Sequence, residues 1–249
     1  MHKTYWILDH DKNKDFRWQH VAEDPFKNWE QSRLPDMKAE MELDMALRCL
    51  YADDKDLGQQ YLRRAITVAD RALREEKCRS ERCRSGYPRN EAELKRTLAY
   101  ARALSGELLD SQLLSEASGQ LASHCDQTRK RDWDEMDQER LITAARLALI
   151  SGAREQAASF LKTKRSLAAN VEEKELLQFL AHPGGHAERM ALAKGFTQLF
   201  EKVRDPEYKP PTPTSPIFHR LDLGALFDKY FVSGDGEIDW TRVVEAVSE

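Results

Sequence analysis

The stretch that decides the fold is LITAARLALISGAREQAASFL, residues 141–161. Leucine and alanine recur in it at steps of three and four residues on both sides of Gly152, which predicts two short helices. Gly152 can adopt a positive φ and so end the first helix, and the small alanines let two helix backbones approach closely. We therefore predict a pair of packed helices with a corner at Gly152.

The same layout occurs twice earlier in the chain. Residues 97–114, TLAYARALSGELLDSQLL, place Gly106 at the corner, and residues 45–62, MALRCLYADDKDLGQQYL, place Asp53 there. The three corners are about fifty residues apart, a spacing typical of stacked helical hairpins. Over residues 35–181 this layout resembles tetratricopeptide-like helical-repeat proteins. The resemblance implies a fold and a mode of binding, and it brings no catalytic residues with it.

The chain is therefore predicted to be all-α, with stacked antiparallel helical hairpins and an irregular repeat of about fifty residues. We expect an N-terminal aromatic arm at 1–34, a helical-hairpin stack at 35–204, a proline-rich linker at 205–216 and a C-terminal tail at 217–249. The arm would either cover the end of the stack or present aromatic anchors to a partner. The tail is apolar enough to require cover, so it should dock on the stack or on a second copy in a homodimer.

The composition sets limits on the function. The 249 residues are 41% hydrophobic and 33% charged, with a net charge of -4, which favours neither nucleic acid nor a membrane as partner. No apolar run approaches the length of a membrane span. The first residues, MHKTYWILDHDKNKDF, lack the basic start and apolar centre of a signal peptide. We therefore expect a cytoplasmic protein.

No cofactor and no metal site are predicted. The four cysteines lack the paired short spacings of a zinc site, so we expect reduced thiols. His182 and His186 flank Pro-Gly-Gly, which keeps them off one helical face. Residues 231–239, FVSGDGEID, resemble the centre of an EF-hand calcium loop, but Phe231 and Arg242 occupy its two end-ligand positions. We interpret this segment as a turn before a final helix.

A basic segment at residues 71–89 separates two of the predicted helix pairs. Glutamates are interleaved with its arginines and lysines and weaken the positive field, which favours a solvated or partner-facing surface over a nucleic-acid site. At the end of this segment, Asn90 and Glu93 have the spacing of a capping box, so we expect the next helix to be capped at Asn90.

Acidic residues gather just before the deciding stretch, in DQTRKRDWDEMD, residues 126–137, and Glu139 continues the series. Acids at a helix start are stabilised by the free amides there, but this number exceeds what capping needs. We predict an acidic patch that binds a partner and has one aromatic anchor. The alternative is that the acids are simply solvated. The predicted partner-binding residues are Asp132, Trp133, Asp134, Glu135 and Asp137.

No phosphate-binding loop, nucleophile elbow or zinc-protease motif occurs in the sequence, so we predict a protein-binding protein and no enzyme. The size, the acidic balance and the loosely repeated helices resemble the all-helical immunity proteins that neutralise a bacterial toxin. That resemblance implies an inhibitor that occludes the active site of a cognate toxin. A tetratricopeptide-like scaffold or adaptor and a secretion chaperone are the alternatives within this class. An enzyme with a carboxylate site, drawn from acids such as Glu172, Glu173 and Glu175, is the alternative outside it.

Overall fold

The structure, a computed structural model, describes residues 5–10, 16–21, 35–74, 88–127, 135–162, 171–181, 194–196, 198–199 and 216–231. These residues confirm the all-α class, since apart from one two-stranded sheet they form helices and the short turns between them. The sheet lies in the predicted arm, where strand β1 (Tyr5–His10) pairs antiparallel with strand β2 (Phe16–Val21).

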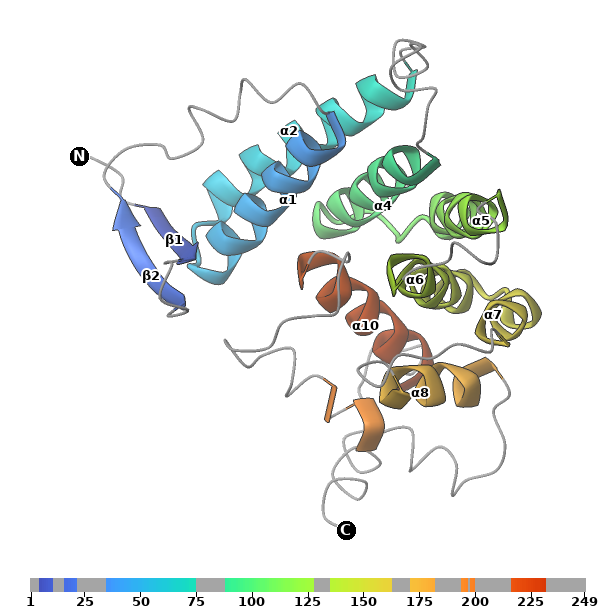
Figure 1. Ribbon diagram of the computed structural model, residues 1–249. Helices are drawn as coiled ribbons and strands as arrows, with labels where there is room; N and C mark the ends of the chain where they lie inside the picture. The colour runs from blue at the N-terminus through green and yellow to red at the C-terminus, as the bar shows by residue number, and fades with distance from the viewer. Residues whose placement is uncertain are drawn as a thin grey trace.

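Eight helices with labels in Figure 1 follow the sheet. They are α1 (Pro35–Tyr51), α2 (Lys55–Arg74), α4 (Pro88–Leu104), α5 (Ser111–Gln127), α6 (Glu135–Ser151), α7 (Arg154–Leu161), α8 (Val171–Ala181) and α10 (Pro216–Phe231). From α1 to α8 each helix packs on the next one in this series, and we call this part the helical body. Helix α10 returns from far along the chain to lie against α6 (Figure 1).

The three predicted corners are confirmed at Asp53, Gly106 and Gly152. Their φ values are 58°, 99° and 91°, and they lie between α1 and α2, α4 and α5, and α6 and α7. The same two backbone hydrogen bonds close the helix before each corner. The corner amide donates to the carbonyl three residues back, and the next amide donates to the carbonyl five residues back. Three separate segments of sequence therefore build one and the same helix ending.

Two of the helices that follow a corner begin with an aspartate cap. The amide of Leu57 donates to the Asp54 carboxylate at 3.1 Å, and the amide of Leu113 donates to the Asp110 carboxylate at 3.0 Å. Each cap satisfies one of the amides that the first turn of a helix leaves without a backbone acceptor.

The predicted cap at Asn90 is wrong. Helix α4 begins at Pro88, two residues earlier, because proline fits the first helical turn, where its missing N–H removes no hydrogen bond. The carboxylate of Glu93, expected to complete a capping box, instead accepts a hydrogen bond from the Arg96 guanidinium at 2.8 Å.

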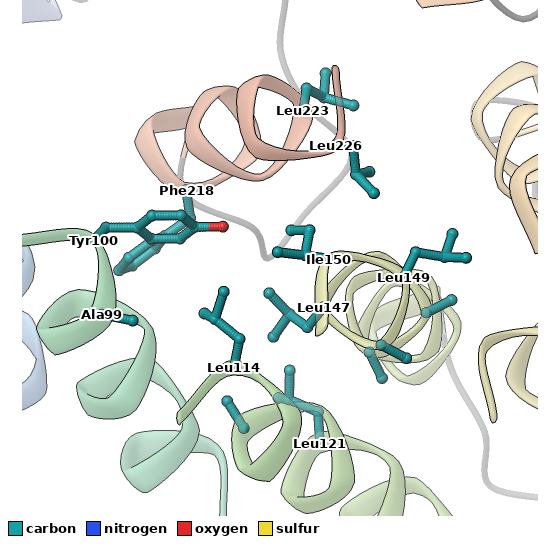
Figure 2. Packing of buried hydrophobic residues seen from close by; sticks show 14 of the residues in the cluster. Ala99, Tyr100, Leu114, Leu121, Leu147, Leu149, Ile150, Phe218, Leu223 and Leu226 are labelled. Atoms are coloured by element: carbon teal, nitrogen blue, oxygen red, sulfur yellow. The ribbon is translucent and has the colours of Figure 1, made fainter. Parts of the chain in front are cut away.

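Helix α6 occupies the centre of the core, and residues 141–150 are all buried. A helix that is apolar on every side must be covered on every side. Figure 2 shows how this is achieved, with Leu114 and Leu121 of α5 on one side of α6 and Phe218, Leu223 and Leu226 of α10 on another. The deciding stretch of the sequence is therefore also the most enclosed element.

Helix α10 is the described part of the predicted tail. It buries Ile217, Phe218, Leu223 and Leu226, and the Phe227 ring meets the Phe196 ring edge to face at 6.0 Å between centroids. The interpreted turn at 231–239 and the helix expected after it lie outside the described residues, apart from Phe231 at the end of α10.

Two further expectations can be compared with the structure. Cys49 and Cys125 are buried and form no disulfide within the described part of the chain, whereas Cys78 and Cys83 lie outside it. Within the described ranges, no helix combines the length and the apolar character that crossing a membrane requires.

Candidate functional site

The predicted acidic patch is only partly within the described chain. Asp132, Trp133 and Asp134 fall outside it, while the backbone of Glu135 and Asp137 lies in the first turn of α6. Glu139 corrects the prediction, because it is 3% exposed and belongs to the protein interior rather than to an acidic surface. The patch as a partner-binding site stays a prediction.

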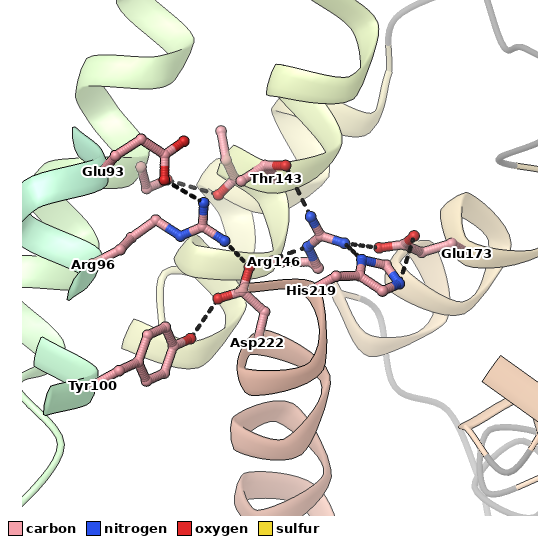
Figure 3. Close-up of polar contacts among 10 residues, drawn as sticks. Glu93, Arg96, Tyr100, Thr143, Arg146, Glu173, His219 and Asp222 are labelled. Carbon is pink, nitrogen blue, oxygen red and sulfur yellow. Dashed lines mark hydrogen bonds and ion pairs between the residues drawn. The ribbon is translucent and has the colours of Figure 1, made fainter. Parts of the chain in front are cut away.

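The structure instead brings together a set of buried polar side chains from four helices, shown in Figure 3, which we call the buried cluster. All of its members except Glu93 are almost fully enclosed. They are Glu93, Arg96 and Tyr100 of α4, Glu139, Thr143 and Arg146 of α6, Glu173 of α8, and His219 and Asp222 of α10.

The Asp222 carboxylate lies at the centre of the buried cluster. Arg96 Nη2 donates a hydrogen bond to its Oδ2 at 2.6 Å, and the Tyr100 hydroxyl donates to its Oδ1. Arg146 Nε lies 3.4 Å from Oδ2. One carboxylate on α10 therefore accepts hydrogen bonds from two donors on α4 and forms an ion pair with Arg146 on α6. Charge-assisted hydrogen bonds of this kind are strong and directional.

Arg146 connects the remaining groups. Its Nη1 donates to Glu173 Oε1 at 2.6 Å and also contacts His219 Nδ1, while its Nη2 donates to Thr143 Oγ1 at 2.8 Å. Because a guanidinium can only donate, Nδ1 of His219 must accept, and the imidazole proton lies on Nε2. That nitrogen is 3.9 Å from Glu173 Oε2.

The surroundings of His219 keep its ring neutral. Burial and then the positive charge of Arg146 lower the pKa of His219 from 6.5 to about 3. A neutral ring is also what the contact with Arg146 requires, since a protonated Nδ1 would point a second donor at the guanidinium. The contact with Arg146 and the lowered pKa thus both indicate that the His219 ring is neutral.

Arg96 and Tyr100 are fixed as proton donors. Burial opposes the charge of Arg96, but the negative charges of Asp222 and Glu93 outweigh it and raise the pKa of the guanidinium. The guanidinium also lies over the Phe218 ring, 4.3 Å from its centroid. Burial and then Asp222 raise the pKa of Tyr100 well above its usual value, so its hydroxyl keeps its proton.

Glu139 is the exception within the buried cluster. Burial and then the nearby charge of Glu173 raise the pKa of Glu139 to about 8. Its Oε1 is enclosed, with no hydrogen-bond partner among the described residues. This carboxyl group is therefore protonated at neutral pH, and its ionisation would place a second negative charge beside Glu173.

A second attachment holds the other end of α10. Lys229 Nζ donates to the Ile150 carbonyl at 2.6 Å, which satisfies one of the acceptors that the end of α6 leaves free. Arg154 lies over the Tyr230 ring at 5.6 Å from its centroid. The C-terminal turn of α10 is thus attached to the corner between α6 and α7.

The buried cluster was not predicted from the sequence, although Arg146 gives one signal for it. Arg146 is the only charged residue in residues 141–153, and a charge within an otherwise apolar helix must be buried and paired. The partners gave no such signal, because Asp222 is 126 residues from Arg96 in the sequence. Glu173 was considered only as one of several acids.

The buried cluster attaches α10 to the helical body. Its charged ends are directed at one another rather than at solvent, as Figure 3 shows. Among the described residues, no group of three or more histidines, cysteines and acids is placed to hold a metal ion. Searches of protein-family models, curated proteins and solved structures find no match to this chain.

Proposed function

We propose that this chain is a protein-binding helical protein with tetratricopeptide-like stacking of its hairpins, and that it acts as an immunity-type inhibitor of a cognate bacterial toxin. The observation that carries the proposal is the identical positive-φ ending before three successive corners. A repeated unit of this kind extends a surface along the chain without a central pocket, and such surfaces typically bind other proteins.

Two exposed apolar side chains support a binding role. Tyr51 at the end of α1 is 91% exposed, and Leu108, just after the second corner, is 94% exposed. A large apolar side chain that projects into water is available as an anchor that a partner could bury. In the buried cluster, by contrast, polar chemistry serves to hold α10, so it supports turnover of a substrate less well than binding of a protein.

The proposal assigns the toxin contact to Asp132, Asp134, Glu135 and Asp137, which lie just before α6 and in its first turn, and the anchor to Trp133. The decisive experiment purifies the chain together with the product of the neighbouring gene. It then measures binding for a variant with Asp132, Asp134, Glu135 and Asp137 changed to lysine. A basic toxin domain should bind the natural chain tightly and salt-sensitively, and the four reversals should weaken it at least tenfold. The melting temperature should hardly change, since exposed charges contribute little to stability.

A matched control changes four exposed acids elsewhere to lysine, so the net charge shifts equally. Suitable positions are Asp56, Glu107, Glu155 and Glu175. If both variants lose affinity equally, total charge and not the patch governs binding. If a confirmed partner binds both variants normally, the contact lies elsewhere, and Tyr51 and Leu108 become the first residues to change. Turnover of a small molecule without any partner would overturn the proposal.

A further inference from the structure

We propose that the face formed by α4, α6 and α8 is a receptor for a carboxylate-bearing helix of another protein, and that α10 is the occupant which such a helix displaces. The proposal rests on the buried cluster alone. It therefore stands whichever partner the acidic patch binds.

The receptor side of the buried cluster is built without α10. Arg96 and Tyr100 belong to α4, Arg146 belongs to α6, and these helices are joined through α5, which packs on both. The two hydrogen-bond donors on α4 and the Arg146 guanidinium converge on one point, occupied by Asp222 (Figure 3). Two planar guanidinium groups held in fixed positions select a carboxylate strongly over a neutral group.

Helix α10 combines apolar packing with a selective polar contact. Ile217, Phe218, Leu223 and Leu226 are buried, and Leu221, Ala225, Phe227 and Tyr230 pack against the core while partly exposed. The Asp222 carboxylate and the His219 ring bring buried polar groups into the same contact. A buried ion pair adds little net stability over an apolar contact of equal size, but it strongly penalises a wrong partner. An element attached in this way is expected to open before the helices beneath it.

The contacts of α10 define the helix that would replace it. The helix needs a carboxylate at the position of Asp222, an aromatic ring four residues earlier to cover Arg96, and apolar residues one and four positions later. A hydrogen-bond acceptor at the position of His219 would serve Arg146. These requirements describe an amphipathic helix with a single acid within its apolar face.

A second copy of the chain is not the favoured occupant. The α10 of the same molecule is tethered and competes at an effective concentration of roughly millimolar. An identical helix from another molecule therefore cannot displace it at micromolar concentration. Only a helix that binds more tightly can do so, for example one with a larger apolar face, and that helix must come from a different protein.

The test uses a fluorescently labelled peptide of residues 216–231 as the probe and measures anisotropy with the full chain. The natural chain should bind the peptide weakly, because its own α10 competes. The chain with Asp222→Ala should bind it at least tenfold more tightly, since the internal helix loses its carboxylate while Arg96, Tyr100 and Arg146 remain. A peptide with Asp222→Asn should lose at least tenfold in affinity for this variant chain.

The chain with Asp44→Ala is the matched control, because Asp44 pairs with Arg48 on α1 in a half-exposed contact away from the buried cluster. It should bind the peptide no better than the natural chain. Should the Asp222→Ala chain fail to fold, the Leu226→Ala chain, which weakens α10 through lost packing, takes its place in the same comparison.

Three results would overturn the inference. The first is absence of peptide binding to a folded variant chain. The second is equal affinity of that chain for the natural peptide and for the peptide with Asp222→Asn. The third is a concentration-dependent dimer that exchanges α10, which would assign the receptor to a second copy. None of these results involves residues 132–137, so failure here is distinct from failure of the proposed toxin contact.

Discussion

The first helix pair and the last helix are held in opposite ways. Between α1 and α2, the contact consists of buried apolar residues such as Leu43, Leu62 and Ala65. The charges of this pair stay near the surface, where Asp44 and Arg48 are 37% and 21% exposed. Helix α10, by contrast, brings His219 and Asp222 into the interior beside arginines that are only 1% exposed.

The difference follows from how each element finds its place. A three-residue turn joins α1 to α2, so the chain itself selects the partner and an undirected apolar contact is sufficient. Helix α10 arrives from beyond residue 181 and could rest on any apolar groove. Buried ion pairs and hydrogen bonds are directional, and each is costly when one partner is missing. They therefore favour one docking position for α10 over the others. Buried charge thus supplies selectivity where proximity in the sequence does not.

The largest expected loss of stability comes from removing the carboxylate at the centre of the buried cluster. Asp222→Ala removes the acceptor shared by Arg96, Tyr100 and Arg146. Loss of one partner of a buried ion pair costs about 3–5 kcal/mol. Because α10 can leave and let water reach the arginines, the loss should fall mainly on α10. Hydrogen exchange should therefore accelerate in α10 far more than in α5.

The matched change in the first helix pair is Asp44→Ala. That pair is half-exposed and spans one helical turn, so its removal should cost less than about 1 kcal/mol. If the two variants are equally stable, the contrast between the two regions is wrong. Uniform acceleration of exchange throughout the Asp222→Ala chain would instead show that α10 and the helical body unfold as one unit.

The next largest effect is a gain in stability. The folded-state pKa of Glu139, about 8, lies above its ordinary value of 4.5, so the native state holds an extra proton between these values. Stability therefore falls as pH rises through this window. Glu139→Gln removes the free-energy cost of keeping this carboxyl protonated in the folded state, which is on the order of 3 kcal/mol at pH 7. In urea denaturation at pH 5, 7 and 9, the free energy of unfolding of the variant should exceed that of the natural chain by a margin that grows as pH rises.

A pH-independent difference between these two chains would contradict the assignment. Glu107→Gln provides the control, because Glu107 is exposed at the second corner and its replacement should leave the pH profile unchanged.

The sequence was sufficient for the fold where the signals are local. A corner needs only Gly106 or Gly152 after an apolar run, and Asp53 tolerates a positive φ better than most residues. The helical stack was likewise predicted to begin at residue 35, and α1 begins there, at Pro35. The start of α4 was missed because Asn90 and Pro88 both signal a helix start, and proline prevailed.

The candidate site could not be predicted in the same way, because its partners are distant in the sequence. Arg146 alone indicated a buried charge, but nothing near it specifies Asp222 or His219. Glu139 shows the opposite problem. It continues a run of surface-like acids, yet it follows the turn of α6 that enters the core. The burial of that position depends on tertiary packing, which the local pattern of acids does not show.

His219 should produce the reverse pH dependence to Glu139. Its folded-state pKa, about 3, lies below its ordinary value of 6.5, so the unfolded chain takes up a proton that the native state refuses. This contribution to stability is complete above pH 6.5 and is lost as pH falls toward 3. The loss is on the order of 2 kcal/mol at pH 5.

The variant His219→Asn tests this assignment, because an amide oxygen can still accept from Arg146 and cannot be protonated in this range. The variant should lose less stability than the natural chain between pH 7 and pH 5. Other histidines affect both chains alike, so the difference between the two profiles isolates His219. Parallel profiles would mean that its ring is already protonated in the folded state.

The smallest expected effect separates a corner that α10 touches from one that it does not. A Cβ at Gly106 would meet nothing within 4 Å, whereas a Cβ at Gly152 would lie 3.4 Å from Lys229 Nζ. Both glycines have a positive φ, so alanine should cost each corner about 1–2 kcal/mol in backbone strain. Gly152→Ala should cost a few tenths of a kcal/mol more, because it displaces the lysine that donates to Ile150.

A double-mutant cycle makes this difference measurable. In a chain that already carries Lys229→Met, the extra cost of Gly152→Ala over Gly106→Ala should disappear, because the displaced hydrogen bond no longer exists. The six chains are the natural chain and the Lys229→Met chain, each alone, with Gly106→Ala and with Gly152→Ala. Thermal unfolding gives the stability cost of each change, and hydrogen exchange in α10 shows whether that helix is affected. If the extra cost persists without Lys229, it arises within the corner itself. The change in stability from the natural chain to the Lys229→Met chain separately measures what the second attachment of α10 contributes.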